Sequence, residues 1–62
     1  MGYTHEISWS EYHTWLDMFV RKSVRTVSDA LQLHLDALKA REYDADGNQN
    51  IVSIRVTTLD NH

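Results

Sequence analysis

One segment with helical periodicity, residues 26–43, constrains the fold of this chain more than any other feature. Apolar side chains recur there at about 100° per residue and form a stripe along one side. The centre of the stripe is made by Val27, Leu31, His34, Leu35 and Leu38. Thr26 places a hydroxyl at the N-cap and Asp29 a carboxylate in the first turn, where the helix dipole favours negative charge. We predict one helix that packs this stripe against another element.

Residues on both sides of this segment alternate between apolar and polar, which is the pattern of a half-buried strand. The alternating positions are Tyr3, His5, Ile7 and Trp9 near the start of the chain, and Val52, Ile54, Val56 and Thr58 near its end. We therefore predict strands at residues 3–9 and 52–59. The leucines of the helix should be buried against Val52, Ile54 and Val56.

Residues 14–20 fit two patterns. Leu16, Met18 and Val20 alternate with their neighbours as in a strand, whereas Trp9, Tyr12, Leu16 and Phe19 have helical spacing. Ser8 and Glu11 also match a capping box. We interpret the segment as a strand, because it is rich in residues that favour strands and because the polar residues 10–13 suit a hairpin loop. The alternative is a first helix over residues 9–23.

These elements predict an α+β fold in the order β-β-α-β. It would be a small two-layer sandwich of one three-stranded sheet with one helix packed on one face, in a single domain of residues 1–62. A right-handed crossover would set the last strand parallel to the second, either adjacent to it or separated from it by the first. The alternative fold is α-α-β.

Length and composition argue against catalysis. With 62 residues the core has little room for a ligand pocket, and there is no nucleophile elbow or glycine-rich phosphate loop. The absence of cysteine removes thiolate ligands, and the four histidines lack the short spacing of a zinc site. Asp44, Asp46, Asn48 and Asn50 begin like a calcium loop, but Gln49 and Arg55 stand where glycine and glutamate are needed. We expect no enzyme, no cofactor and no metal.

The lack of cysteine and of a visible targeting segment suggests a cytoplasmic protein, in the host cytoplasm if a phage encodes it. We expect no membrane partner. A net charge of −3 disfavours a dedicated nucleic-acid binder. The chain should instead bind a protein through the sheet face that the helix leaves open.

In the predicted register that open face carries four candidate protein-binding residues: Trp15, Phe19, Arg21 and Arg55. Aromatic residues and arginine are enriched at binding hot spots. If the register is reversed, Trp15 and Phe19 are core residues. A second hypothesis is a regulator that binds single-stranded nucleic acid through Arg21, Lys22, Arg25 and Arg55. A third is a structural homodimer, formed by the open face or by the helix edge at Leu33, Ala37 and Ala40.

The residues Thr26, Asp29, Ala30 and Leu31 at the helix start, followed by Val52-Ser53-Ile54-Arg55-Val56, give the chain a family resemblance. Over residues 14–56 it resembles the small early-gene RNA polymerase inhibitors of lytic podophages. The resemblance implies a protein that binds the host RNA polymerase and blocks transcription. Arginines of the last strand contact the polymerase in that family. Arg55 stands in a comparable place, and the second arginine has no counterpart here.

Overall fold

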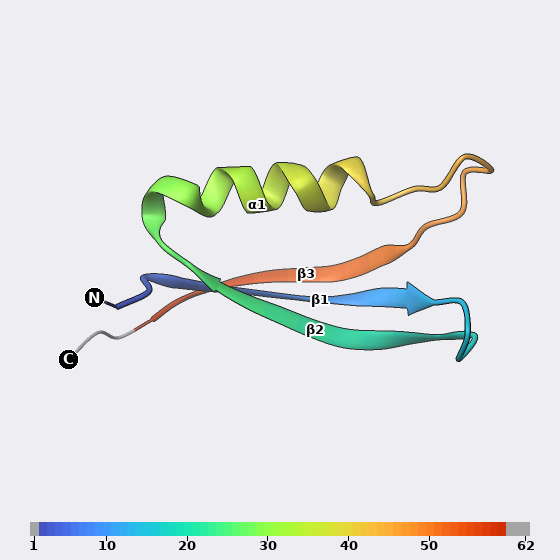
Figure 1. Cartoon of the computed structure of the whole chain (residues 1–62), viewed down its shortest axis with the longest axis horizontal. Helices are drawn as coiled ribbons and strands as arrows, with labels where there is room; N and C mark the ends of the chain where they lie inside the picture. The colour runs from blue at the N-terminus through green and yellow to red at the C-terminus, as the bar shows by residue number, and fades with distance from the viewer. Residues whose placement is uncertain (1, 60–62) are drawn as a thin grey trace.

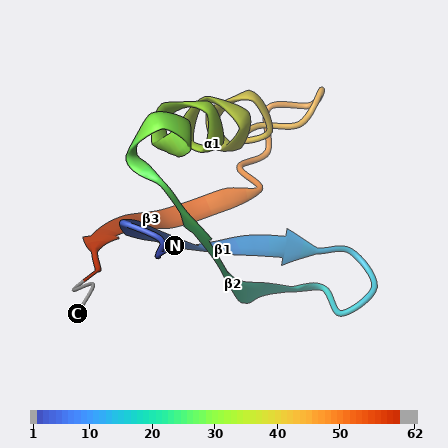
Figure 2. The ribbon, with the colours of Figure 1, turned by 60° about the vertical axis from the view of Figure 1, so that its left-hand side comes forward.

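The computed structural model describes residues 2–59, which form one sheet and one helix (Figure 1). The elements are β1 (His5–His13), β2 (Met18–Thr26), α1 (Ser28–Ala40) and β3 (Ile51–Thr58). Their order confirms the predicted β-β-α-β arrangement. The helix lies along one side of the sheet, as both views of the ribbon show (Figure 2).

β1 is the central strand and pairs antiparallel with both neighbours, so the strand order is β2-β1-β3. β2 and β3 therefore run in the same direction on either side of β1. Of the two arrangements left open by the sequence, the structure has the one in which the first strand separates the other two. Both edge strands leave one row of backbone groups unpaired within the described sheet.

The β1–β2 hairpin turns at residues 14–17 and not at the predicted loop 10–13. The backbone N–H of Asp17 donates to the carbonyl oxygen of Thr14 at 3.3 Å, and Asp17 has a φ of 51°. Aspartate tolerates this left-handed conformation better than most residues, which favours the turn here. The alternative helix over residues 9–23 and the strand position given to Trp15 are both wrong.

The core is small and lies between α1 and the sheet. Its buried apolar side chains are Ile7 and Trp9 of β1, Leu38 of α1 and Ile51 of β3. Leu31 and Leu35 are partly buried against them, which places the predicted helical stripe on the sheet side. The alternation of Ile7 and Trp9 in β1 is also as predicted.

A bulge in β3 changes which of its residues reach the core. Ser8 pairs with Arg55 and Ser10 with Val52, so two steps along β1 match three along β3. Ser53 lies within the bulge and has a φ of 57°. The extra residue reverses the alternation beyond it. As a result Ile51 is fully buried, whereas Val52 pairs with a residue on the other face. Ile54 and Val56 are exposed, so the predicted burial of the helix leucines against Val52, Ile54 and Val56 is wrong.

The helix starts later than predicted and without the predicted cap. Its N-cap is Val27, which makes no side-chain capping hydrogen bond, and Thr26 is the buried last residue of β2. Asp29 lies in the first turn, where it complements the helix dipole. Residues 41–43, which the prediction included, follow the helix as a turn and an isolated bridge.

Within residues 2–59 no helix has the length and apolar character needed to cross a membrane.

Candidate functional site: the open sheet face

The face of the sheet that points away from α1 is the candidate site, and we call it the open sheet face. Ile7 and Trp9 point toward the helix, so the intervening residues of β1 and their cross-strand partners point the other way. The partner pairs on this face are Glu6 with Arg25, Ser8 with Arg55, Ser10 with Arg21 and Tyr12 with Phe19. The face is therefore built around three arginines.

Arg21 lies across the middle of the open sheet face. Its guanidinium donates to the Ser8 hydroxyl oxygen at 2.9 Å, and at 3.4 Å to both the Ser10 hydroxyl and the Ser53 carbonyl oxygen. These partners lie on β1 and in the β3 bulge, so the side chain spans all three strands. Contacts of this kind hold a guanidinium in place before a partner arrives, which reduces the entropy lost on binding.

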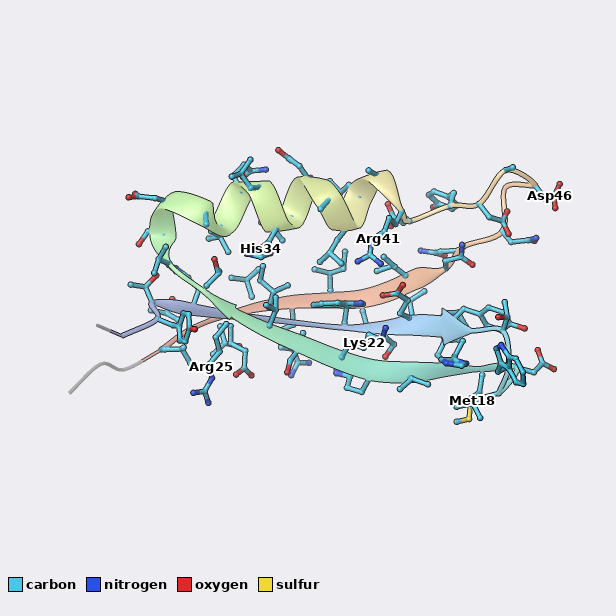
Figure 3. All side chains as sticks on the ribbon, in the orientation of Figure 1. Met18, Lys22, Arg25, His34, Arg41 and Asp46 are labelled. Carbon is cyan, nitrogen blue, oxygen red and sulfur yellow. The ribbon has the colours of Figure 1, made fainter. Side chains whose placement is uncertain are left out.

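The charges on the open sheet face are mostly positive. Arg25 pairs with Glu6 through Nε and Oε1 at 3.2 Å, and Figure 3 shows Arg25 on the side of the sheet away from the helix. The three strands place on this face three of the six basic residues and one of the nine acidic residues of the chain. Its sign is thus opposite to the net charge of −3.

The predicted site residues are brought together only in part. Phe19, Arg21 and Arg55 lie on the open sheet face as predicted, and Phe19 is 42% exposed. Trp15 is 92% exposed in the hairpin turn, off the face. The reversed register, in which Trp15 and Phe19 would be core residues, is excluded. Arg25 joins the face from the alternative set of predicted residues, whereas Lys22 does not.

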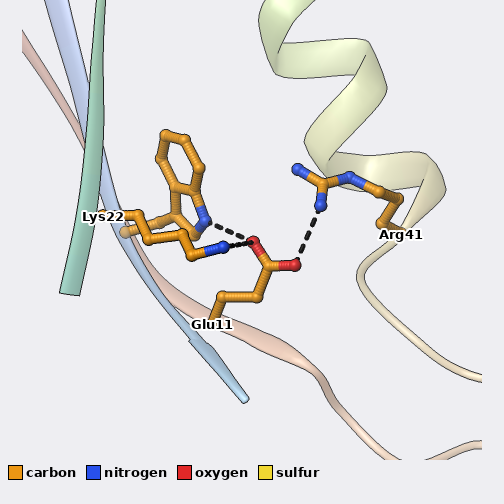
Figure 4. Close-up of polar contacts among 4 residues, drawn as sticks. Glu11, Lys22 and Arg41 are labelled. Atoms are coloured by element: carbon orange, nitrogen blue, oxygen red, sulfur yellow. Dashed lines mark hydrogen bonds and ion pairs between the residues drawn. The ribbon is translucent and has the colours of Figure 1, made fainter. Parts of the chain in front are cut away.

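Lys22 instead belongs to a polar cluster on the helix side of the sheet, centred on Glu11 (Figure 4). The Trp9 indole N–H donates to Glu11 Oε1 at 2.9 Å, and Arg41 donates to Glu11 Oε2 at 2.8 Å. The Lys22 ammonium nitrogen lies 4.0 Å from Glu11 Oε1. The indole hydrogen bond lowers the pKa of Glu11 most; burial opposes this, and the charges of Arg41 and Lys22 lower it further. The cluster links the end of α1 to β1.

The α1–β3 loop forms its own hydrogen-bonded turn. Asp44 Oδ1 accepts from the backbone N–H groups of Asp46 and Asn48, both at 2.9 Å, and Gly47 has a φ of 84°. These hydrogen bonds, with that of Asn48 first, lower the pKa of Asp44. The alternating polar residues of this loop are thus used by its own backbone. No group of three or more potential metal-ligating side chains occurs within residues 2–59.

Sequence reasoning missed Tyr12, which it had placed in the hairpin loop. The Tyr12 and Phe19 rings meet edge to face, with centroids 5.7 Å apart and an angle of 68° between their planes. The Tyr12 hydroxyl donates to Asp17, and this hydrogen bond raises the pKa of Tyr12. Periodicity gave no signal for Tyr12, because the apolar–polar alternation of β1 breaks after Trp9, where Glu11 is polar and Tyr12 is apolar.

The helix edge proposed for self-association is exposed. Leu33 is 71% exposed, and Ala37 and Ala40 are also exposed. A cavity of about 150 Å³ lies beside this edge, beneath α1, and is lined in part by Trp9, Val24 and Ala37. It is smaller than the ~300 Å³ at which pockets for drug-sized ligands begin.

Comparison with protein-family models, with curated proteins and with solved structures finds no match to this chain.

Proposed function

We propose that this chain is a non-catalytic binding protein that docks its open sheet face on an acidic surface of a protein partner. The single observation that carries the proposal is the concentration of Arg21, Arg25 and Arg55 on one face of a chain that is acidic overall. Arginine binds carboxylates through two parallel hydrogen bonds and is enriched at binding hot spots. Complementary charge steers such partners together and fixes their orientation.

We further propose that the partner is a host macromolecule and that its first candidate is bacterial RNA polymerase, which the chain would inhibit as a phage accessory protein. This step is supported by the resemblance of residues 14–56 to the small podophage inhibitors. Arg55 lies on the open sheet face, at the position comparable to a contact residue of that family. The chain would then act in the host cytoplasm.

A binding assay with purified bacterial core RNA polymerase tests this proposal. We expect a complex that survives size-exclusion chromatography, and inhibition of transcription from a strong promoter. The triple variant Arg21→Gln, Arg25→Gln and Arg55→Gln should lose both. If the wild-type chain neither binds the polymerase nor inhibits it at micromolar concentration, the assignment to RNA polymerase is wrong.

A regulator of single-stranded nucleic acid is the second candidate, because Tyr12 and Phe19 lie on the same face as the arginines. Aromatic rings beside basic side chains are how such proteins stack bases and contact phosphates. Fluorescence anisotropy with a labelled oligothymidylate at two salt concentrations tests it. Tight binding that weakens steeply with salt would favour this function over the protein partner.

A further inference from the structure

A surface hollow of about 380 Å³ lies between the β1–β2 hairpin and the α1–β3 loop. Its volume is within the range of small-ligand pockets, which begin at ~300 Å³. Tyr12 and Phe19 line it from the hairpin, and Asp44, Asn48, Gln49 and Asn50 line it from the loop. An aromatic pair and an aspartate therefore line one concave surface.

The two rings form adjoining walls. Their planes meet at 68° with centroids 5.7 Å apart, so they present surfaces in two directions. Tyr12 is also held by the hydrogen bond from its hydroxyl to Asp17. The faces of aromatic rings carry partial negative charge and attract cations that lie over them.

The loop side of the hollow supplies oxygen acceptors and one carboxylate. Asp44 Oδ1 accepts from two backbone N–H groups at 2.9 Å, and Oδ2 accepts from the Asn48 amide at 3.3 Å. These donors stabilise the ionised carboxylate and fix its orientation. A carboxylate oxygen has two lone pairs, so Oδ2 can accept a further hydrogen bond from a ligand.

We propose that this hollow binds an organic cation, namely the guanidinium group of an arginine side chain on a partner protein. Guanidinium is planar and weakly hydrated, so it stacks on aromatic faces better than an ammonium group and donates to a carboxylate at the same time. At the hollow the partner would supply the positive charge, whereas at the open sheet face the arginines of this chain supply it. It rests on its own geometry and does not require the partner to be RNA polymerase.

A chemical-shift titration of the ¹⁵N-labelled full chain with N-acetyl-arginine methylamide tests the proposal. We expect saturable shifts at the amides of Tyr12, Phe19 and Asn48, with a dissociation constant of about 1 mM to 10 mM for so small a ligand. The citrulline analogue has the same shape without the charge, and we expect it to bind at least about fivefold more weakly.

Variants show which groups hold the cation. Asp44→Asn keeps a side-chain oxygen for the loop amides but removes the charge, and should weaken binding about fivefold to tenfold. Phe19→Leu removes the ring and should weaken it about twofold to fivefold. Asp36→Asn, on the exposed side of α1, removes the same charge elsewhere and should leave the titration unchanged.

Three results would overturn the proposal. They are equal binding of the citrulline analogue, unchanged binding by Asp44→Asn, and no shifts at ligand concentrations well above the expected constant. Tighter binding of N-acetyl-lysine methylamide would overturn the choice of arginine. None of these results depends on the polymerase assay, so the failure of this proposal and of the proposed function can be told apart.

Discussion

At the residue scale, Glu11 is a charged residue that lies beside the small apolar core and contributes to stability through polar contacts. It is mostly buried between β1 and α1, where the Trp9 indole, Arg41 and Lys22 surround it. Unfolding would return this carboxylate to water and remove three favourable partners. The folded chain therefore favours the ionised over the protonated carboxyl of Glu11 more strongly than the unfolded chain does.

Glu11→Gln should lower the unfolding free energy at pH 7 by ~1 kcal/mol, because the amide loses the charge interactions but keeps an acceptor for the indole. The folded pKa of Glu11 is lowered from its ordinary 4.5, so this contribution is present above that value and is lost as pH falls through the folded pKa. Urea denaturation between pH 3 and pH 7 should show the wild type and the variant converging in acid.

Glu6→Gln is the matched control, since Glu6 pairs with Arg25 in a more exposed position. We expect it to change stability by less than ~0.5 kcal/mol at any pH. If the difference in unfolding free energy between the wild type and Glu11→Gln stays constant down to pH 3, the role given to the Glu11 charge is wrong.

The sequence left Trp15 ambiguous between the open face and the core, and stability measurements can separate it from the buried Trp9. Trp15→Ala should change the melting temperature by no more than a degree or two, because the side chain is 92% exposed. Trp9→Ala should cost ~3–5 kcal/mol and serves as the positive control. Loss of cooperative unfolding in Trp15→Ala, measured by circular dichroism, would mean that this tryptophan is a core residue.

At the scale of elements, the β3 bulge decides which residues of that strand are buried. Ser53 must adopt a left-handed backbone there, which costs ~1–2 kcal/mol for a residue with a Cβ. A strand pattern read at constant period two from Val52 cannot reveal this, because the inserted residue has no distinctive side chain. This is why the sequence placed Val52 against the helix and missed Ile51.

Substitutions at the bulge test this geometry. Ser53→Gly should raise the unfolding free energy by ~0.5 kcal/mol, because glycine adopts the left-handed region freely, whereas Ser53→Val should lower it by ~1–2 kcal/mol. Gly47→Ala is the reference variant. Gly47 also has a positive φ, and an added Cβ there meets nothing within 4 Å, so any loss of stability in this variant comes from the backbone conformation and not from a steric clash. If Ser53→Val unfolds at the same denaturant concentration as the wild type, the bulge is not at Ser53.

The helix presents one buried and one exposed leucine for comparison. Leu38→Ala should cost ~2–5 kcal/mol because its side chain is buried, whereas Leu33→Ala should cost less than ~0.5 kcal/mol. Equilibrium urea unfolding measures both. A large cost for Leu33→Ala that grows with protein concentration would contradict a monomer and support the homodimer formed through the helix edge.

At the scale of the whole molecule, the chain exposes more surface than a compact protein of its size. Its accessible area is 4788 Å², against about 4,100 Å² expected for a compact monomer of 7.2 kDa. Ile54 and Val56 share the helix-facing side of β3 yet are 36% and 42% exposed. A partner that covers these apolar side chains and binds only the folded form would raise the unfolding free energy of the chain.

The helix and the central positions of β1 followed from periodicity, since each has a strong and unbroken pattern. The second strand, and with it the element order, followed from its strand-favouring residues, because its periodicity fits a helix as well. The hairpin turn did not, because residues 14–17 contain neither glycine nor proline and the turn depends on Asp17 in an unusual conformation. That displacement moved Trp15 off the predicted site and brought Tyr12 into it. Phe19, Arg21 and Arg55 were placed on the correct face because they alternate with apolar residues on the helix side, Val20 in β2 and Val56 in β3.

The proposed docking of the chain through its open sheet face can be tested by comparing two matched charge neutralisations. Arg55→Gln removes one positive charge from that face, and Lys39→Gln removes one from the exposed side of α1. Affinity for core RNA polymerase would be measured by biolayer interferometry at low and physiological salt. We expect Arg55→Gln to weaken binding at least about tenfold and Lys39→Gln to leave it within about twofold. Equal effects of the two variants, or a larger effect of Lys39→Gln, would contradict docking through the open sheet face.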